Sequence, residues 1–189
     1  MSVPHPTPTN KEIKLKKHKY IVSKTDAKGK ILYANEYFSQ VCGYTVQELI
    51  GAPHNIIRHP DMPKAVFYLL WEHIQNGRNI SAVVKNLTKN GDYYWVVTDF
   101  EIRRNSETNV ITQYVAFRHH VPGKVIKQIE PLYAKMLEIE QVQGMEASIE
   151  FLQSFLDEQQ MSYDQYIEKL ARPSGLAAKL FERMKKLFD

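Results

Sequence analysis

Between residues 20 and 122 the hydrophobic positions first alternate, then recur every three to four residues, and then alternate again. Alternation is typical of half-buried strands, and the longer spacing is typical of amphipathic helices. We therefore predict five strands, over residues 20–24, 31–34, 79–88, 93–104 and 110–120. A turn containing Gly29 joins the first two strands, and the hairpin signal Asn90-Gly91 joins the third to the fourth.

Three short helices are predicted between the second and third strands. Asn35 is a good N-cap for the first, and Thr45 and Glu48 form a capping box for the second. Asp61 can cap the third helix, which runs to about residue 75. This order of elements predicts an α+β domain in which the helices cover one face of a five-stranded antiparallel sheet.

After Gly123 the pattern is helical to the end of the chain. We expect helices at about 124–140, 146–159, 162–171 and 174–188, with Ser174 capping the last. Pro131 should kink the first of them or begin a second helix. The chain is thus divided into a flexible, basic segment (1–19), a sheet domain (20–122) and a helical region (123–189).

Composition narrows the class of protein. Of 189 residues, 43% are hydrophobic and 24% are charged, as in ordinary globular proteins. The net charge of +4 is too small to indicate nucleic acid as a partner. One cysteine, Cys42, excludes an internal disulfide framework, and no apolar run is long enough to span a bilayer. We expect a cytoplasmic protein.

Catalytic chemistry has no sequence signature here. The chain shows no nucleophile–base pair, paired carboxylates or metal-binding cluster, so we expect that it is not an enzyme. His119 and His120 are adjacent in a predicted strand and point to opposite faces, which argues against a two-histidine metal site.

One stretch carries a specific resemblance: Gly51-Ala-Pro-His-Asn-Ile-Ile-Arg-His-Pro-Asp-Met-Pro-Lys64. It is followed by Trp71, by Val84-Lys-Asn86 and by Tyr94-Trp95-Val96. Together with the order of the elements, these residues resemble the PAS domain of Aer-type aerotaxis receptors. The resemblance implies a PAS fold that binds FAD and reports redox state to chemotaxis signalling.

The chain lacks the membrane anchor, HAMP region and coiled-coil signalling module of those receptors. It resembles instead a split form, in which a small PAS protein partners a separate membrane-bound, methyl-accepting chemotaxis-type transducer. The implied location is the cytoplasm, with peripheral attachment to the inner membrane through that partner or through the amphipathic C-terminal helix. A homodimer is kept open as an alternative.

The resemblance suggests that Arg58, His59 and Asp61 bind the cofactor. The planar guanidinium of Arg58 suits bidentate contact with a phosphate, and the alternative is a surface salt bridge with Asp61. His59 either hydrogen-bonds the cofactor or orients Asp61. For Asp61, capping of the following helix remains the alternative.

Asn35, Trp71 and Asn86 complete the predicted cofactor site. Asn35 is also explained as a helix cap, and Trp71 as ordinary core packing. Asn86 shares a strand face with Val84 and Ala82, where a polar side chain is costly unless it has a partner. A flavin edge offers that partner, and we expect Asn86 to read the protonation of flavin N5.

Haem and an empty pocket are the alternatives to FAD. Ile80 stands where the family receptor has Trp, so flavin stacking must come from elsewhere or be weaker. A haem PAS domain needs an axial ligand, for which His73, His54 and His59 are candidates. Light-sensing PAS domains form a flavin adduct with a cysteine in an Asn-Cys-Arg-Phe-Leu-Gln run. Cys42 instead precedes Gly-Tyr, and we interpret it as a core cysteine. After an FAD sensor and a haem sensor, the third hypothesis is a PAS domain that binds no ligand and acts as a protein-interaction module.

The signal is expected to leave through an exposed surface. The candidates are the outer face of the sheet, to which Tyr94, Val96 and Phe117 are assigned by parity, and the helix after Gly123.

Overall fold

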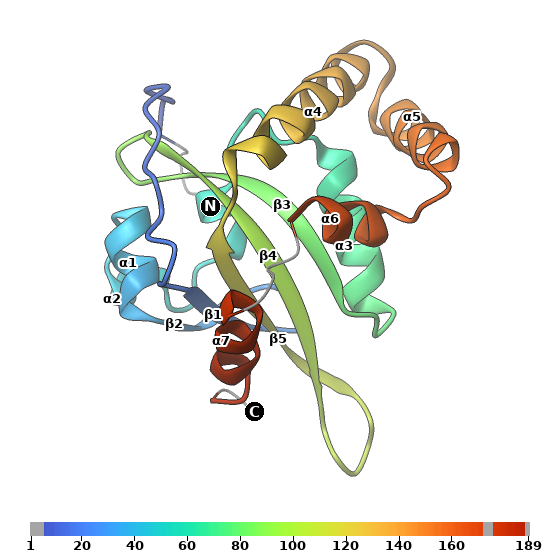
Figure 1. Cartoon of the computed structure of the whole chain (residues 1–189). Coiled ribbons are helices and arrows are strands. Elements are labelled where there is room, and N and C mark those ends of the chain that lie inside the picture. Colours follow the sequence, from blue (N-terminus) through green and yellow to red (C-terminus); the bar gives the residue numbers. More distant parts are fainter. Residues whose placement is uncertain (1–5, 172–175, 188–189) are drawn as a thin grey trace.

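The computed structural model describes residues 6–171 and 176–187, and its centre is a curved five-stranded sheet (Figure 1). The strands are β1 (Ile21–Asp26), β2 (Ile31–Ala34), β3 (Ile80–Leu87), β4 (Tyr93–Arg104) and β5 (Ile111–His120). They lie in the order β2-β1-β5-β4-β3, and every neighbouring pair is antiparallel. The predicted α+β class, with its antiparallel sheet, is confirmed.

Small helices fill the chain between β2 and β3: α1 (Glu36–Cys42), α2 (Val46–Leu49), the 3₁₀ turn η1 (His54–Ile57) and α3 (Lys64–Gln75). Asn35 caps α1, accepting a hydrogen bond from the amide of Phe38, and Gly43 ends the helix at φ 76°. The capping box of Thr45 and Glu48 is present at α2. These local predictions are confirmed because each depends on residues three or four apart.

The C-terminal region forms α4 (Gly123–Gln143), α5 (Met145–Glu158), α6 (Tyr163–Ala171) and α7 (Leu176–Lys185). Helix α4 runs through Pro131 without a break, so of the two expected outcomes, a kink or a second helix, the second helix is wrong. The hydroxyl of Tyr133 on α4 lies 2.8 Å from the carbonyl oxygen of Val83 and 2.6 Å from the hydroxyl of Tyr163 on α6. These contacts fix α4 and α6 to the edge strand β3. The predicted cap Ser174 lies outside the described residues.

Asp61 does not cap α3, which corrects the sequence prediction. Helix α3 begins at Lys64 after Pro63, which offers no capping side chain. Its first two amides donate instead to the carboxylate of Glu140, near the end of α4. The carboxylate of Asp61 lies 2.7 Å from the ammonium of Lys85. The cap of α3 is therefore Glu140, 75 residues from Ala65 along the chain, and not the neighbouring Asp61.

The strand register decides which side chains face which way. Thr98 lies opposite Arg118, and both point to the face covered by α3. The register also puts Tyr94 and Val96 on that inner face, and only Phe117 on the outer one, so the expected grouping of the three is wrong. Part of the outer face is covered by α7, whose Met184 packs against the cluster of Val22, Val115 and Phe117 (Figure 1).

The N-terminal segment is not a solvated lead-in over its described part. The amide of Ile13 donates to the carbonyl of Tyr93, and the amide of Tyr93 donates to the carbonyl of Lys11. Leu15 is buried in the core. The segment from residue 9 therefore lies along β4 and its preceding turn. Within the described residues, no helix has the length and apolarity needed to cross a membrane.

Candidate ligand-binding site

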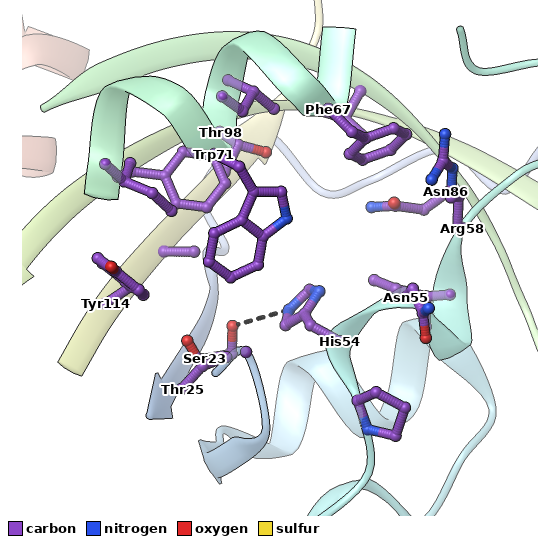
Figure 2. Close-up of a pocket in the computed structure, with 18 of the residues that line it drawn as sticks. Ser23, Thr25, His54, Asn55, Arg58, Phe67, Trp71, Asn86, Thr98 and Tyr114 are labelled. Atoms are coloured by element: carbon purple, nitrogen blue, oxygen red, sulfur yellow. Dashed lines mark hydrogen bonds between the residues drawn. The ribbon is translucent and has the colours of Figure 1, made fainter. Parts of the chain in front are cut away.

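A cavity of about 450 Å³ lies between the inner face of the sheet and the helices η1 and α3 (Figure 2). Volumes of this size are typical of small-molecule sites. The sheet supplies its floor from β1, β3, β4 and β5, and the turn between β1 and β2 supplies part of its rim. Met145, the first residue of α5, also lines it.

Aromatic side chains make the apolar part of the cavity. Phe67 and Trp71 project from α3, and Tyr114 projects from β5 (Figure 2). The rings of Trp71 and Tyr114 meet edge to face with centroids 5.8 Å apart. Gly29 lets the β1–β2 turn close on Trp71, because a Cβ there would lie 3.0 Å from the indole ring. Ile80 is buried but does not line the cavity, so flanking rings come from α3 and β5.

The charge of the cavity lining has a single sign. Four cationic side chains line it, Lys28, Arg58, Lys64 and Arg118, and no Asp or Glu is among the described lining residues. No ion pair within 4 Å is described for any of the four. Lys28 and Lys64 are exposed to solvent, whereas Arg58 and Arg118 are desolvated, and for these two an anionic ligand group would supply a counter-charge.

Arg118 is the most deeply buried of these cations, at 3% exposure. Its guanidinium donates to the hydroxyl of Ser23 at 2.9 Å and to Nε2 of His54 at 2.8 Å. Burial lowers the pKa of Arg118 to about 10. Burial, and then the charge of Arg118, lower the pKa of His54 well below its ordinary value. His54 is therefore a neutral acceptor at pH 7, and the cluster carries one uncompensated positive charge.

Two polar atoms of the cavity floor lack hydrogen-bond partners. The amide nitrogen of Asn86 on β3 and the hydroxyl of Thr98 on β4 are both buried, and neither makes a hydrogen bond of normal geometry with the described residues. The Asn86 side chain is close enough to the Tyr94 hydroxyl, its cross-strand neighbour, to oppose the rise of the Tyr94 pKa by burial. Buried polar groups are rarely left unpaired because each costs about 1–3 kcal/mol. Asn86 thus points into the cavity with a free donor, as the alternation of its strand predicts.

Arg58 lines the same cavity from the turn after η1. Its guanidinium carbon lies 4.0 Å from the centroid of the Phe67 ring, a cation–π contact. The salt bridge considered between Arg58 and Asp61 is not formed, since Asp61 pairs with Lys85. Burial lowers the pKa of Arg58, and the negative charge of Glu140 opposes that shift. The side chain is therefore desolvated and has no carboxylate in direct contact.

Three of the six predicted site residues lie outside this cavity. Asn35 is occupied by backbone groups, accepting from Val22 and Phe38 and donating to the carbonyl of Tyr20. His59 is buried but does not line the cavity, and it accepts a hydrogen bond from the amide of Asp61. Asp61 is half-exposed on the outer side of β3. The structure brings Arg58, Trp71 and Asn86 together at the cavity and leaves these three apart from it.

Sequence reasoning missed Ser23 and Arg118 as cavity residues, and it considered His54 only as a haem ligand. The signal for Arg118 was present, because it alternates with Tyr114 and Ala116 on one strand face. For the haem reading, only His54 of the three candidate histidines lines the cavity. Its Nε2 is already bonded to Arg118. Among the described residues, no group of three or more His, Cys, Asp or Glu side chains is arranged to hold a metal ion.

Comparison with known proteins gives consistent results. Residues 31–117 match the family described as the PAS fold. The aerotaxis receptor of Escherichia coli (strain K12) is 42% identical over 133 residues, which are 68% of this chain and 25% of the receptor. The chain therefore matches about a quarter of the length of that curated relative.

Solved structures agree on the fold. A light-oxygen-voltage domain, studied with a flavin analogue, is 19% identical with a TM-score of 0.52, covering 58% of this chain and 82% of that one. The dark structure of the blue-light photoreceptor Aureochrome1 LOV is 21% identical with a TM-score of 0.52, covering 64% of this chain and 86% of that one. At these identities, the likeness establishes the architecture and leaves ligand and signal to be argued from the site.

Proposed function

The chain belongs to the PAS-domain proteins, with a domain similar to that of an aerotaxis receptor, and on that premise we propose that it is a redox sensor that binds FAD. In this proposal the protein is not an enzyme. It relays the state of the bound flavin to the chemotaxis machinery through a separate membrane-bound transducer.

The observation that carries the proposal is the chemistry of the cavity lining. Four cations without described ion pairs surround an aromatic slot that also contains an unpartnered amide and an unpartnered hydroxyl. A flavin nucleotide is flat and aromatic, has hydrogen-bonding edges, and carries phosphate. Each part of that ligand has a matching group in the lining.

Specific roles follow from the positions of the side chains. When bound, FAD supplies a ring system that takes up and releases electrons together with protons. Phe67 and Trp71 exclude water from the slot, and the free amide of Asn86 donates to the ring edge. Arg118 balances negative charge at the floor, while Arg58 holds a phosphate nearer to the rim.

A chemotaxis transducer is proposed as the partner because the matched residues are similar to those of an aerotaxis receptor. The route to it runs through α4, which begins directly after β5. A homodimer is the alternative assembly. Pull-down from the native cells should recover a chemotaxis transducer, and recovery of the PAS protein alone, with a dimer mass in solution, would replace that partner by a second copy.

An absorbance spectrum of the gently purified protein, with and without added FAD, tests the cofactor directly. We expect paired flavin bands that persist after gel filtration. A Soret band would replace FAD by haem, and a spectrum that remains blank with excess FAD would leave only an interaction module. Steady NADH oxidation faster than that of free flavin would contradict the non-enzymatic role.

A further inference from the structure

The first turn of α3 is held by a side chain from another helix. Pro63 precedes the helix and cannot cap it. The amide of Lys64 donates to one carboxylate oxygen of Glu140 at 2.9 Å, and the amide of Ala65 donates to the other at 2.7 Å. A carboxylate satisfies two helix-end donors in this way and also interacts favourably with the helix dipole.

The helix held in this way is a wall of the cavity. Lys64, Phe67 and Trp71 line it from the first two turns of α3. Because a helix moves as a rigid element, the position of its first turn sets where these side chains stand over the sheet. Glu140 therefore helps to fix the shape of the cavity without touching it.

Glu140 is also linked electrostatically to Arg58. Arg58 lies against the helix that Glu140 holds, because its guanidinium carbon is 4.0 Å from the centroid of the Phe67 ring in the first turn of α3. The charge of Glu140 acts on this guanidinium and opposes the lowering of the Arg58 pKa by burial, although no direct ion pair between the two is described. An anionic ligand group next to Arg58 would compete with Glu140 for this cation. The carboxylate thus interacts with two parts of the cavity lining, the start of α3 and Arg58.

The middle of α4 is anchored to the sheet, and its end reaches the cavity wall. Tyr133, two turns earlier, is buried and bonded to the carbonyl of Val83, which anchors the middle of the helix to the sheet. Beyond Glu140 the chain turns at Gly144, and Met145 returns to line the cavity. The α4–α5 junction therefore contacts the cavity wall through Glu140 and Met145, while Tyr133 provides a fixed point.

We propose that Glu140 is a positioning residue that couples the ligand cavity to the α4–α5 helices. It holds the cavity wall in place, and its interaction with Arg58 weakens when an anionic ligand group takes the guanidinium. The second part rests on the proposed function, in which that group is the phosphate of a flavin. Since coupling is reciprocal, a change at α4 alters ligand affinity as much as ligand alters α4.

Hydrogen exchange of the ligand-free protein tests the first part. Glu140→Ala should speed exchange at the amides of Lys64 and Ala65 by roughly tenfold, as loss of a helix cap predicts. Glu138→Ala is the matched control, because Glu138 lies on the same helix and its described ion pair, with Lys135, is exposed. Equal exchange in the two variants would overturn the role of Glu140.

Flavin titration tests the second part. Glu140→Gln keeps an oxygen acceptor for α3 and removes the charge that competes for Arg58. The dissociation constant for FAD should fall relative to that for riboflavin, which has no phosphate, by about threefold or more, a typical effect of one partly screened charge. A purely structural cap would change both constants by the same factor, and that result would overturn the coupling.

The two experiments separate the inference from the proposed function. A wild-type protein that binds neither flavin would refute the flavin proposal, and the exchange comparison would then decide the role of Glu140 alone. If the wild-type protein binds flavin and Glu140→Gln has the same ratio of FAD to riboflavin affinity, the flavin proposal stands and the coupling through Glu140 is refuted.

Discussion

Two buried cations lie on opposite faces of the same sheet, and the protein treats them differently. On the outer face, the ammonium of Lys85 lies 2.7 Å from the carboxylate of Asp61 and 4.4 Å from the centroid of the Tyr93 ring. On the inner face, Arg118 is bonded to a hydroxyl and to an imidazole, and no carboxylate among the described residues pairs with it. The outer charge is neutralised within the fold, and the inner charge is not.

The difference teaches how a site is recognised without a ligand. A buried charge costs stability unless it is paired, and a fold under selection for stability alone would pair it. Asn86 and Thr98, with unpartnered polar atoms, lie on the same inner face as Arg118. These two atoms and the charge of Arg118 lie where a ligand is proposed to bind, whereas Lys85 on the outer face has a carboxylate partner within the fold.

Arg118→Met should produce the largest effect. Loss of one partner of a buried charged pair typically costs 2–5 kcal/mol, so FAD affinity should fall by ~100-fold. Lys85→Met, which removes the cation on the other face, should leave FAD affinity within about twofold of wild type. Fluorescence titration of flavin measures both, and equal losses would remove the distinction between the two faces.

Asp61→Asn tests the paired side of the comparison. It leaves the buried ammonium of Lys85 without its carboxylate, and we expect a loss of about 1–2 kcal/mol in the free energy of unfolding. Urea denaturation of the ligand-free protein measures it, with the exposed Glu107→Gln as control. An unchanged midpoint would mean that Asp61 contributes nothing to holding Lys85, and the two cations would then be alike.

The pH dependence of stability should reveal His59, which lies beside the ion pair of Lys85 and Asp61. Burial, followed by the charge of Lys85, lowers the pKa of His59 to about 4, while Asp61 opposes the shift. The unfolded chain therefore binds a proton near pH 6.5 that the folded protein excludes until about pH 4. Stability is lost as the pH falls through this window, by roughly 1 kcal/mol per pH unit.

His59→Gln should flatten that loss between pH 6.5 and 4, because glutamine keeps an acceptor for the amide of Asp61 and does not titrate. The exposed His18→Gln is the control and should leave the slope unchanged. Denaturation midpoints at several pH values supply the measurement. Parallel curves for wild type and His59→Gln would assign the pH dependence to other buried groups.

The sequence predicted features that depend on short-range contacts. Asn35 and Thr45 cap their helices because the groups they bind are three residues away. The helix cap assigned to Asp61 failed because Glu140, far along the chain, occupies that position. The spacing of residues within one segment cannot reveal this cap, because the contact between Glu140 and α3 depends on how α4 folds back over the domain.

The candidate site was predicted in part for the same reason. Asn86 was placed correctly on an inner strand face by alternation within one strand. The grouping of Tyr94 with Phe117 failed because parity between two strands depends on their register, which the turn after Arg104 sets. Arg118 and Ser23 come together only when β1 pairs with β5, and no local pattern records that pairing.

Asn86→Leu should give the smallest effect of these substitutions, and its effect on stability should be opposite in sign to that of Asp61→Asn. The substitution removes a buried amide with a free donor from the inner face, where Val84 is its apolar neighbour on the strand. The ligand-free protein should therefore become more stable, by about 1 kcal/mol, because an unpaired donor is lost. FAD affinity should fall only a fewfold, since one neutral hydrogen bond is worth about 1 kcal/mol.

If the role of Asn86 is functional rather than structural, Asn86→Leu should raise the stability of the ligand-free protein and weaken signalling. Flavin should remain bound in Asn86→Leu, while the tactic response of cells that carry it is blunted, because the donor at the ring edge is gone. Asn79→Leu, at the exposed start of the same sheet region, is the control and should change neither quantity. A less stable ligand-free Asn86→Leu protein would show that the amide has a partner within the fold, and the inner face would then be as complete as the outer one.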